Sequence, residues 1–485
     1  MLFNSYIFLF VLLPLSLAGY YLLNHFRHDQ VAKCWLVAAS LFFYAYFNPW
    51  YLLILGGSIV LNFLFGRLIL SQPQESAGRC AAAVVAILLN LGVLFCFKYY
   101  DFFVSNLNAW FAGDWPLLHL VLPLGISFFT FQQVSYIVDC RRGTAPRYPF
   151  WDYALFVSFF PQLVAGPIVL HSEMLPQFAD PARKKFNREN FAKGMTALAL
   201  GLMKKCLLAD TFGAGVTWGY ANIEGLGTGN AALVILAYTL QIYFDFSGYC
   251  DMATGIGLLF NIELPQNFHS PYRALTVADF WKRWHMTLTR FFTAYLYIPL
   301  GGNRRGKWRT YGNVFLVFLV SGLWHGANWT FILWGALHGA AVVFCRAAGS
   351  WLKRIPRLLL WPLTFLFLNC TWVFFRAESI AQGWALLREF FSLQFLHLDV
   401  RLFNAMALPE LTAVRRLLGQ DLRFNTIVIL AFFLCALLGA VFLRNTNERL
   451  ADFRPSAPLA LLSAGLILWS IVSLTGVSVF LYFNF

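Results

Sequence analysis

Apolar windows of about 20 residues recur along the whole of this 485-residue chain, and each is long enough for an α-helix to cross the ~30 Å hydrocarbon core of a bilayer. Hydrophobic residues make up 59% of the sequence and charged residues only 12%, against about 25% charged in soluble domains. A water-soluble fold could not bury this much apolar surface. Because spanning helices satisfy all their backbone groups internally, the sequence predicts an all-α, polytopic integral membrane protein.

Hydropathy predicts about 11 to 12 transmembrane helices. The opening stretch, MLFNSYIFLFVLLPLSLAGYYLL, is counted as the first, because it lacks the basic region and small-residue cleavage site of a signal peptide. Two further apolar stretches, 153–170 and 286–300, are short or interrupted by proline, so we expect them to be re-entrant. The predicted spans are 6–23, 34–48, 50–66, 80–97, 117–138, 194–212, 230–250, 311–329, 330–345, 358–375, 425–443 and 458–482.

The distribution of lysine and arginine orients these spans. In this layout the loops on one side hold 27 of the 36 basic residues, and the positive-inside rule makes that side cytoplasmic and places the N-terminus outside. Topology and contact with anionic headgroups account for the net charge of +14, so no nucleic-acid partner is expected. The basic loops are 24–33, 67–79, 139–150, 180–193, 264–290, 301–310, 346–357 and 444–454.

A long segment on the opposite side, 377–424, contains GWALLREFFSLQF, which has helical periodicity, before a less apolar stretch. We expect a periplasmic or interfacial helical insert there. The rest of residues 1–485 is interpreted as one membrane domain.

Several sequence matches to known catalytic or binding motifs are rejected because the surrounding residues do not fit the motif. GGNRRGK fits the start of a phosphate-binding loop, but Trp308 follows where serine or threonine is needed, and no strand precedes it. HFRHD, at 25–29, matches an H-x-x-x-D pattern of some soluble acyltransferases but lies in a short connecting loop. The chain has no G-x-S-x-G motif for a serine hydrolase and no cysteine spacing for zinc, so no metal site is expected.

Polar residues instead cluster in three stretches. The first is QIYFDFSGYCDMATGIG, which places Asp245, Ser247 and Asp251 at the inner end of a span. Ionised side chains are costly there unless they face protein or water, so we expect the carboxylates to act in capping or in pairs with lysine or arginine. The glycines of this stretch allow close contact between helices.

The second stretch is PYRALTVADFWKRWHMTLTRFF, residues 271–292. Trp281 and His285 are four residues apart, so we expect them to share a helix face, with Lys282 and Arg283 turned elsewhere. This basic, aromatic helix either lies in the membrane interface or, together with Trp284, receives an anionic acyl carrier or nucleotide.

The third stretch is SGLWHGANWTFILWGALHG, residues 321–339. His325 falls beyond the middle of its predicted span, flanked by Trp324, Asn328 and Trp329. A histidine inside a membrane needs a partner or a water-filled cavity, which favours a functional role. His338 is interpreted as a packing residue or as a residue that supports the site.

At these residues the chain resembles the membrane-bound O-acyltransferases, and especially their alginate O-acetylation branch. The second and third stretches, together with YFDFSGYCDMATGIG before them, are similar to the family's central signature. LVAGPIV at 163–169 resembles its earlier conserved turn, and FLYFNF resembles the end of that branch. The resemblance implies a multi-span bundle around a central tunnel. It also implies that His325 is the catalytic histidine and His285 the second conserved one.

Acyl transfer from a thioester to a sugar hydroxyl needs a base with a pKa near neutrality, and histidine is the side chain closest to that. His325 is predicted to be this base, with Trp324 and Trp329 excluding water and Asn328 orienting a polar partner. Trp281, Arg283, Trp284 and His285 are predicted to form the donor entrance.

The resemblance implies acetyl-CoA as donor, with an acyl carrier protein as the alternative, and no bound cofactor. It implies exopolysaccharide as acceptor, periplasmic acetylation proteins as partners and the bacterial inner membrane as location. Two alternatives stay open: transfer of D-alanyl or another acyl group to teichoic acid or lipid, and a transporter or flippase without enzymatic activity, although no inverted repeat is visible.

Overall fold

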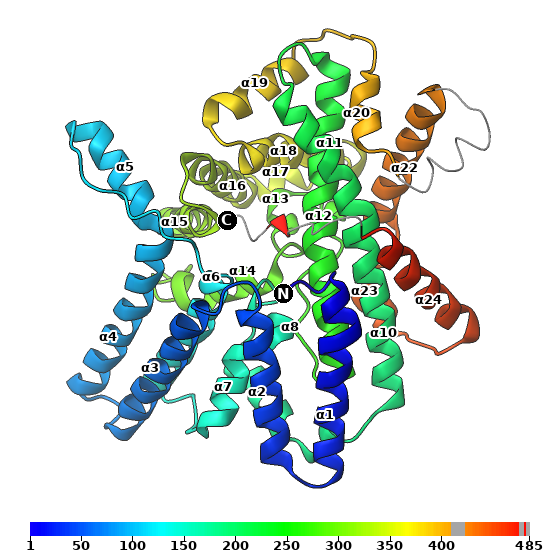
Figure 1. Cartoon of the computed structure of the whole chain (residues 1–485). Coiled ribbons are helices and arrows are strands. Elements are labelled where there is room, and N and C mark those ends of the chain that lie inside the picture. The colour runs from blue at the N-terminus through cyan, green and yellow to red at the C-terminus, as the bar shows by residue number, and fades with distance from the viewer. Residues whose placement is uncertain (409–421, 475–479, 482–485) are drawn as a thin grey trace.

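The computed structural model describes residues 1–408, 422–474 and 480–481 (Figure 1). These residues form helices joined by turns and extended segments, with no β-strand among them. In the first half of the chain the helices are η1 (Phe8–Leu12), α1 (Leu13–His25), α2 (Asp29–Ala45), α3 (Tyr51–Ser71), α4 (Ala77–Leu94), η2 (Phe95–Tyr99), α5 (Tyr100–Phe111), α6 (Ile126–Arg142), α7 (Phe150–Ser158), α8 (Phe160–Leu163), α9 (His171–Ala179), η3 (Pro181–Lys184), α10 (Arg188–Leu202), η4 (Met203–Ala209) and α11 (Asp210–Ala221). In the second half they are α12 (Gly227–Leu259), η5 (Pro271–Arg273), α13 (Val277–Phe280), α14 (Met286–Phe292), η6 (Thr293–Tyr297), α15 (Lys307–His325), α16 (Trp329–Ala347), α17 (Gly349–Leu352), α18 (Arg357–Arg376), α19 (Ile380–Phe390), α20 (Val400–Ala405), α22 (Leu422–Phe442), α23 (Thr446–Ala451) and α24 (Ala457–Val472).

Within the described residues, seven helical segments are long and apolar enough to cross a membrane. Each coincides with a predicted span, which confirms the prediction of an all-α integral membrane protein. The other predicted spans fall on helices that are shorter or less apolar, and the total of about 11 to 12 crossings stays a prediction. The seven segments are Phe8–His25, Tyr51–Ser71, Ala77–Phe111, Gly227–Leu259, Trp329–Ala347, Arg357–Arg376 and Asn425–Phe442.

One predicted span begins too early. Residues 117–125 of the span placed at 117–138 are not helical, and α6 starts only at Ile126. Pro123 provides no backbone N–H, and Gly125 has a left-handed φ of 71°, which interrupts a right-handed helix. The preceding segment is instead fixed by Asp101, whose carboxylate accepts backbone N–H groups at distances of 2.8 and 2.9 Å.

The two stretches predicted to be re-entrant form short helices. α7 and α8 have nine and four residues, whereas α14 and η6 have seven and five. None of these is long enough by itself to cross a bilayer. Most residues of α7, α8 and α14 are buried, whereas none of the residues of η6 is.

Hydrogen bonds connect the basic loops with one another. Lys184 pairs with Asp29 at 2.5 Å, and Arg147 donates to the Leu70 carbonyl at 3.1 Å. Asn445 donates to Ser270, which joins two more of these loops. Figure 1 shows the α1–α2 and α3–α4 turns at one end of the molecule, with α19 and α20 at the other. This arrangement is the one expected from a single cytoplasmic face, although the orientation itself stays a prediction.

The predicted insert at 377–424 includes α19 and α20, while its residues 409–421 lie outside the described residues. Ser379 caps α19 by accepting from the Gln382 N–H at 3.1 Å. The carboxylate of Glu389 accepts the Gly227 N–H, so α19 is fixed to the start of α12. The end of the last predicted span and the final four residues of FLYFNF also lie largely outside the described residues.

The long helix α12 lies at the centre of the fold, and 78% of its most apolar window is buried. Its two carboxylates form ion pairs with adjacent lysines of η4: Asp245 with Lys205 at 2.7 Å and Asp251 with Lys204 at 2.6 Å. The structural role expected for these aspartates is therefore confirmed. A buried ion pair is tolerated when both charges are paired and hydrogen-bonded.

Glycine contacts bring α10 close to α12. A Cβ atom on Gly255 would lie 2.7 Å from the Gly194 carbonyl oxygen, and one on Gly201 would lie 2.7 Å from the Gly248 oxygen. Substituting either position would force the two helices apart. The close packing predicted from the glycines of α12 is thus confirmed at Gly248 and Gly255.

Candidate active site

His325 is the last residue of α15, and its side chain is only 2% exposed. Gly326 follows in extended backbone and ends the helix. Three aromatic rings surround the imidazole, with centroid distances of 4.9 Å to Trp324, 5.2 Å to Trp334 and 5.1 Å to Phe375. The side chain is therefore held in a dry, aromatic environment.

The side chain of His285 lies near that of His325 but comes from a different part of the chain. His285 lies between α13 and α14 in a left-handed conformation, with a φ of 45°, and its side chain is fully buried. This break makes the expectation that Trp281 and His285 share a helix face wrong, because α13 ends at Phe280 and the helical phase is lost before His285. Left-handed backbone is unusual for a residue other than glycine, asparagine or aspartate and often occurs at functional sites.

The imidazole rings of His285 and His325 are 6.5 Å apart, centroid to centroid, although 40 positions separate them in the sequence. Trp324 packs beside both, with its ring 6.1 Å from that of His285. At this separation the two imidazoles do not hydrogen-bond directly to each other. They lie close enough to act on one small group placed between them.

The side chain of Asn267 fixes His285. Its Oδ1 accepts the backbone N–H of Thr287 at 3.2 Å and the Thr287 hydroxyl at 2.9 Å, which identifies this atom as the oxygen. The same oxygen is 3.0 Å from His285 Nδ1, so the hydrogen of this bond must be on the imidazole. Neutral His285 is therefore the Nδ1–H tautomer, and its Nε2 carries the lone pair.

Trp281 is fixed in a similar way. Its indole N–H donates to His338 Nδ1 at 3.1 Å, so neutral His338 carries its hydrogen on Nε2 and donates to the Thr371 hydroxyl at 3.0 Å. His338 is thus a buried packing residue that orients Trp281, as expected. The Trp281 ring contacts Trp334, the tryptophan that also packs against His325.

A cavity of about 370 Å³ lies beside Trp281. Most of its wall is apolar and comes from α14, α15 and α16. Lys282 and Arg346 are exposed residues of its lining, whereas Ser321 is buried. Because residues four apart are neighbours on a helix, Ser321 lies one turn before His325 on α15. The lining of the cavity therefore includes exposed cationic side chains and a residue one helical turn from His325, although neither His285 nor His325 lines it.

The comparisons with known proteins identify the family of this site. The family model described as MBOAT, membrane-bound O-acyltransferase family, matches residues 124–377. This range contains His285, His325 and every residue that lines the cavity. This chain belongs to the membrane-bound O-acyltransferase family. It is therefore a membrane O-acyltransferase.

Relatives of this membrane-bound O-acyltransferase match most of the chain. A peptidoglycan O-acetyltransferase of Helicobacter pylori is 40% identical over 519 residues, covering 100% of this chain and 98% of the relative. A probable alginate O-acetylase of Pseudomonas aeruginosa is 39% identical, covering 81% of this chain and 75% of the relative. A teichoic acid D-alanyltransferase of Bacillus subtilis is 27% identical, covering 55% and 71%.

Two residues predicted to contact the donor lie away from the cavity of this acyltransferase. The Arg283 guanidinium pairs with Asp279 at 3.0 Å and also donates to the His269 carbonyl. Trp284 is buried among aromatic rings, including Trp372 at 5.1 Å. Trp281 is the member of the predicted set that lines the cavity, whereas sequence reasoning missed the contribution of Arg346 from α16.

The residues predicted to surround His325 differ in their placement. Trp324 is buried and stacks on Phe131 at 5.3 Å, and its role in excluding water stays a prediction. The prediction for Trp329 is wrong, because its side chain is 46% exposed and its indole N–H donates to Asn106. Asn328 caps α16 by accepting the N–H of residue 330 and donates to the carbonyl of residue 378, so its amide is already engaged rather than directed at a substrate.

Sequence reasoning also missed Lys98, which falls just after the predicted span 80–97. Its ammonium group donates to the carbonyls of Trp324 and His325 at 2.6 and 3.3 Å and to the Ser127 hydroxyl at 3.3 Å. A cation suits the carbonyl end of a helix. Lys98 therefore fixes the end of α15 that carries His325, a role signalled in the sequence only by a lone lysine at the end of an apolar run.

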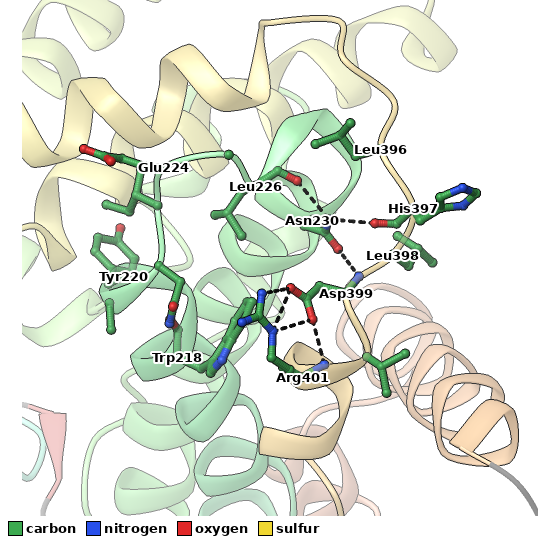
Figure 2. Close-up of a pocket in the computed structure, with 15 residues that line it drawn as sticks. Trp218, Tyr220, Glu224, Leu226, Asn230, Leu396, His397, Leu398, Asp399 and Arg401 are labelled. Carbon is green, nitrogen blue, oxygen red and sulfur yellow. Dashed lines mark hydrogen bonds and ion pairs between the residues drawn. The ribbon is translucent and has the colours of Figure 1, made fainter.

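A larger pocket, of about 800 Å³, lies between the α11–α12 turn and the segment before α20 (Figure 2). Its polar groups mainly hold these two segments together. Asn230 bonds to the His397 carbonyl and the Asp399 N–H, and Asp399 pairs with Arg401 at 2.7 Å. Hydrogen bonds from Arg401 keep the pKa of Asp399 below its ordinary value. This pocket is on the side predicted to be periplasmic.

Among residues 1–408, 422–474 and 480–481, no group of three or more histidine, cysteine, aspartate or glutamate side chains is arranged to hold a metal ion.

Proposed function

We propose that this membrane O-acyltransferase transfers an acetyl group from a cytoplasmic thioester to a polysaccharide hydroxyl on the other side of the bacterial inner membrane. The observation that carries the proposal is the pair of buried histidines, His285 and His325. Near them lies a cavity whose lining includes Trp281 and exposed cationic side chains. Both histidines are within the region matched by the acyltransferase family. Family membership also disfavours the transporter or flippase alternative.

In this proposal His325 is the general base. Its neutral imidazole takes the proton of the acceptor hydroxyl as the hydroxyl oxygen attacks the thioester carbonyl carbon. The new C–O bond forms, the C–S bond then breaks, and the proton held by His325 passes to the leaving thiolate. His285, with the lone pair on Nε2, accepts a hydrogen bond from the reacting groups, while Trp324 keeps bulk water from hydrolysing the thioester.

We assign the donor to the cavity beside Trp281. Acetyl-CoA carries phosphates on a long, flexible arm, and the lining offers Lys282 and Arg346 as exposed cations with an apolar wall behind them. An acyl carrier protein, whose arm also carries a phosphate, is the alternative donor. Arg283 and Trp284 act on the donor only through their neighbours, since neither lines this cavity.

The acceptor is proposed from the relatives. The alginate O-acetylases favour an exopolysaccharide of the alginate or cellulose type, modified directly or through periplasmic acetylation proteins. A second acceptor, peptidoglycan, is favoured by the relative that matches the full length of this chain. Transfer of D-alanine to teichoic acid has less support, because those relatives match only about half of the chain.

The experiment uses the full-length protein in proteoliposomes supplied with radiolabelled acetyl-CoA or acetyl-carrier protein and with alginate oligosaccharides or peptidoglycan fragments as acceptors. The cell's own exopolysaccharide and peptidoglycan, isolated with and without the gene, are analysed for acetyl esters. We expect thioester-dependent acetyl esters on one acceptor. Absence of acetyl transfer from both donors, together with unchanged ester content in both polymers, would refute the proposal.

A further inference from the structure

A groove between α10, α23 and α24 lies outside the site described above. α24 joins α10 through a hydrogen bond from the Ser463 hydroxyl to Thr196 at 3.4 Å. On its outer side α24 exposes large apolar residues, among them Leu461 at 74% and Val472 at 73%, as a helix that faces lipid does. Beside this contact is a cavity of about 330 Å³.

One part of the groove is apolar. Leu459, Leu462 and Leu466 of α24 line it, and their spacing of three and four residues places them along one face of the helix. Leu200 of α10 forms part of the opposite wall. The dimensions and lining suit a hydrocarbon chain lying along α24.

The other part is cationic. Three arginines, Arg444, Arg449 and Arg454, line it with a single carboxylate, that of Asp452. Arg444 pairs with this carboxylate, and Arg449 uses its Nε to bond a backbone carbonyl. Arg454 makes no hydrogen bond or ion pair with any residue in the described part of the chain. Two guanidinium groups are thus available to an anion.

These charges lie next to the start of α24, which Ser456 caps through the Leu459 N–H. The positive end of the helix macrodipole adds to the attraction for an anion. The arginines belong to the loop 444–454, one of the loops predicted to be cytoplasmic. The groove therefore combines a cationic end at the predicted cytoplasmic membrane surface with an apolar body directed into the bilayer.

We propose that this groove binds an anionic phospholipid of the cytoplasmic leaflet, with its phosphate at Arg449 and Arg454 and an acyl chain along the leucines of α24. Planar guanidinium groups match the oxygens of a phosphodiester, and basic pockets between membrane helices bind anionic headgroups. A free phosphate would not use the apolar body, so the occupant is a lipid. The site is independent of the acyl-transfer reaction.

The test is native mass spectrometry of the full-length protein exchanged into phosphatidylglycerol or phosphatidylcholine with identical acyl chains. We expect the wild-type protein to retain phosphatidylglycerol preferentially. Arg449→Gln/Arg454→Gln should weaken this retention about 25-fold, since each basic residue near a membrane surface contributes about fivefold. Arg304→Gln/Arg305→Gln is the matched control, because it removes two exposed arginines from another basic loop that does not line the groove.

A second variant tests the apolar part. Leu462→Trp fills the groove without altering charge and should also lower retention, while melting temperatures verify that each variant is folded. Equal retention by the Arg449/Arg454 variant and its control would overturn the proposal, as would unchanged retention by Leu462→Trp. Displacement of the lipid by millimolar glycerophosphate would assign the site to a free phosphate group and would also overturn it.

Discussion

The prediction that follows most directly from the geometry concerns Asn267, whose Oδ1 accepts three hydrogen bonds, two from Thr287 and one from His285. Asn267→Ala leaves three buried donors without this acceptor, at a cost of about 1–3 kcal/mol of stability each. It also removes the bond that selects the Nδ1–H tautomer of His285. That bond is worth about 0.5–1.5 kcal/mol net, so the acyl-transfer rate per folded molecule should fall about 2- to 12-fold.

Two further variants separate this effect from a loss of stability. Asn267→Asp keeps an acceptor oxygen and should restore most of the rate at pH 8, with a loss at lower pH because the added carboxylate favours the charged imidazolium. Thr287→Val removes a hydrogen bond from the same oxygen without touching His285, so it should lower stability but leave the rate per folded molecule within about twofold. Rates are measured with a radiolabelled acetyl thioester and melting by scanning fluorimetry. The reasoning is refuted if Asn267→Ala transfers acyl groups at the wild-type rate per folded molecule. It is also refuted if Asn267→Asp is no faster than Asn267→Ala at pH 8.

Three other predictions can be tested in parallel. An impermeant thiol reagent applied to whole cells should label a cysteine introduced at position 400 but not one at position 305; the reverse result would contradict the topology. Lys282→Met should raise the KM for the acyl donor up to about fivefold with little change in kcat, as expected for an exposed charge contact, and an unaltered KM would place the donor elsewhere. Asp245→Ala leaves the buried Lys205 with Asp210 as its remaining carboxylate partner, so it should lower the free energy of unfolding by about 1.5–3 kcal/mol, whereas an unchanged unfolding midpoint would show that the Asp245–Lys205 pair has no structural role.

Features that depend on local periodicity could be predicted from the sequence. The helical spans followed from apolar windows, and the ion pairing of Asp245 followed from the cost of an isolated charge in a membrane. The region around His325 was also foreseeable, because a histidine inside an apolar run requires specific surroundings.

Features that depend on tertiary packing were missed. His285 has a left-handed backbone and a hydrogen bond to Asn267, a residue 18 positions earlier, so spacing alone wrongly placed this histidine on a continuous helix. Arg346 joins the cavity from a helix more than 60 positions after Lys282, and Lys98 reaches the end of α15 from a different span. No local pattern brings such distant side chains together.

The central claim is that acyl transfer depends on the imidazole of His325, and the most direct measurement compares purified His325→Gln with the wild-type protein. Glutamine keeps much of the bulk and hydrogen-bonding capacity but cannot take up a proton near neutral pH. Transfer of radiolabelled acetyl groups in proteoliposomes should fall at least about 100-fold, while expression and melting temperature stay the same. A His325→Gln protein that transfers acetyl groups at the wild-type rate would contradict the account.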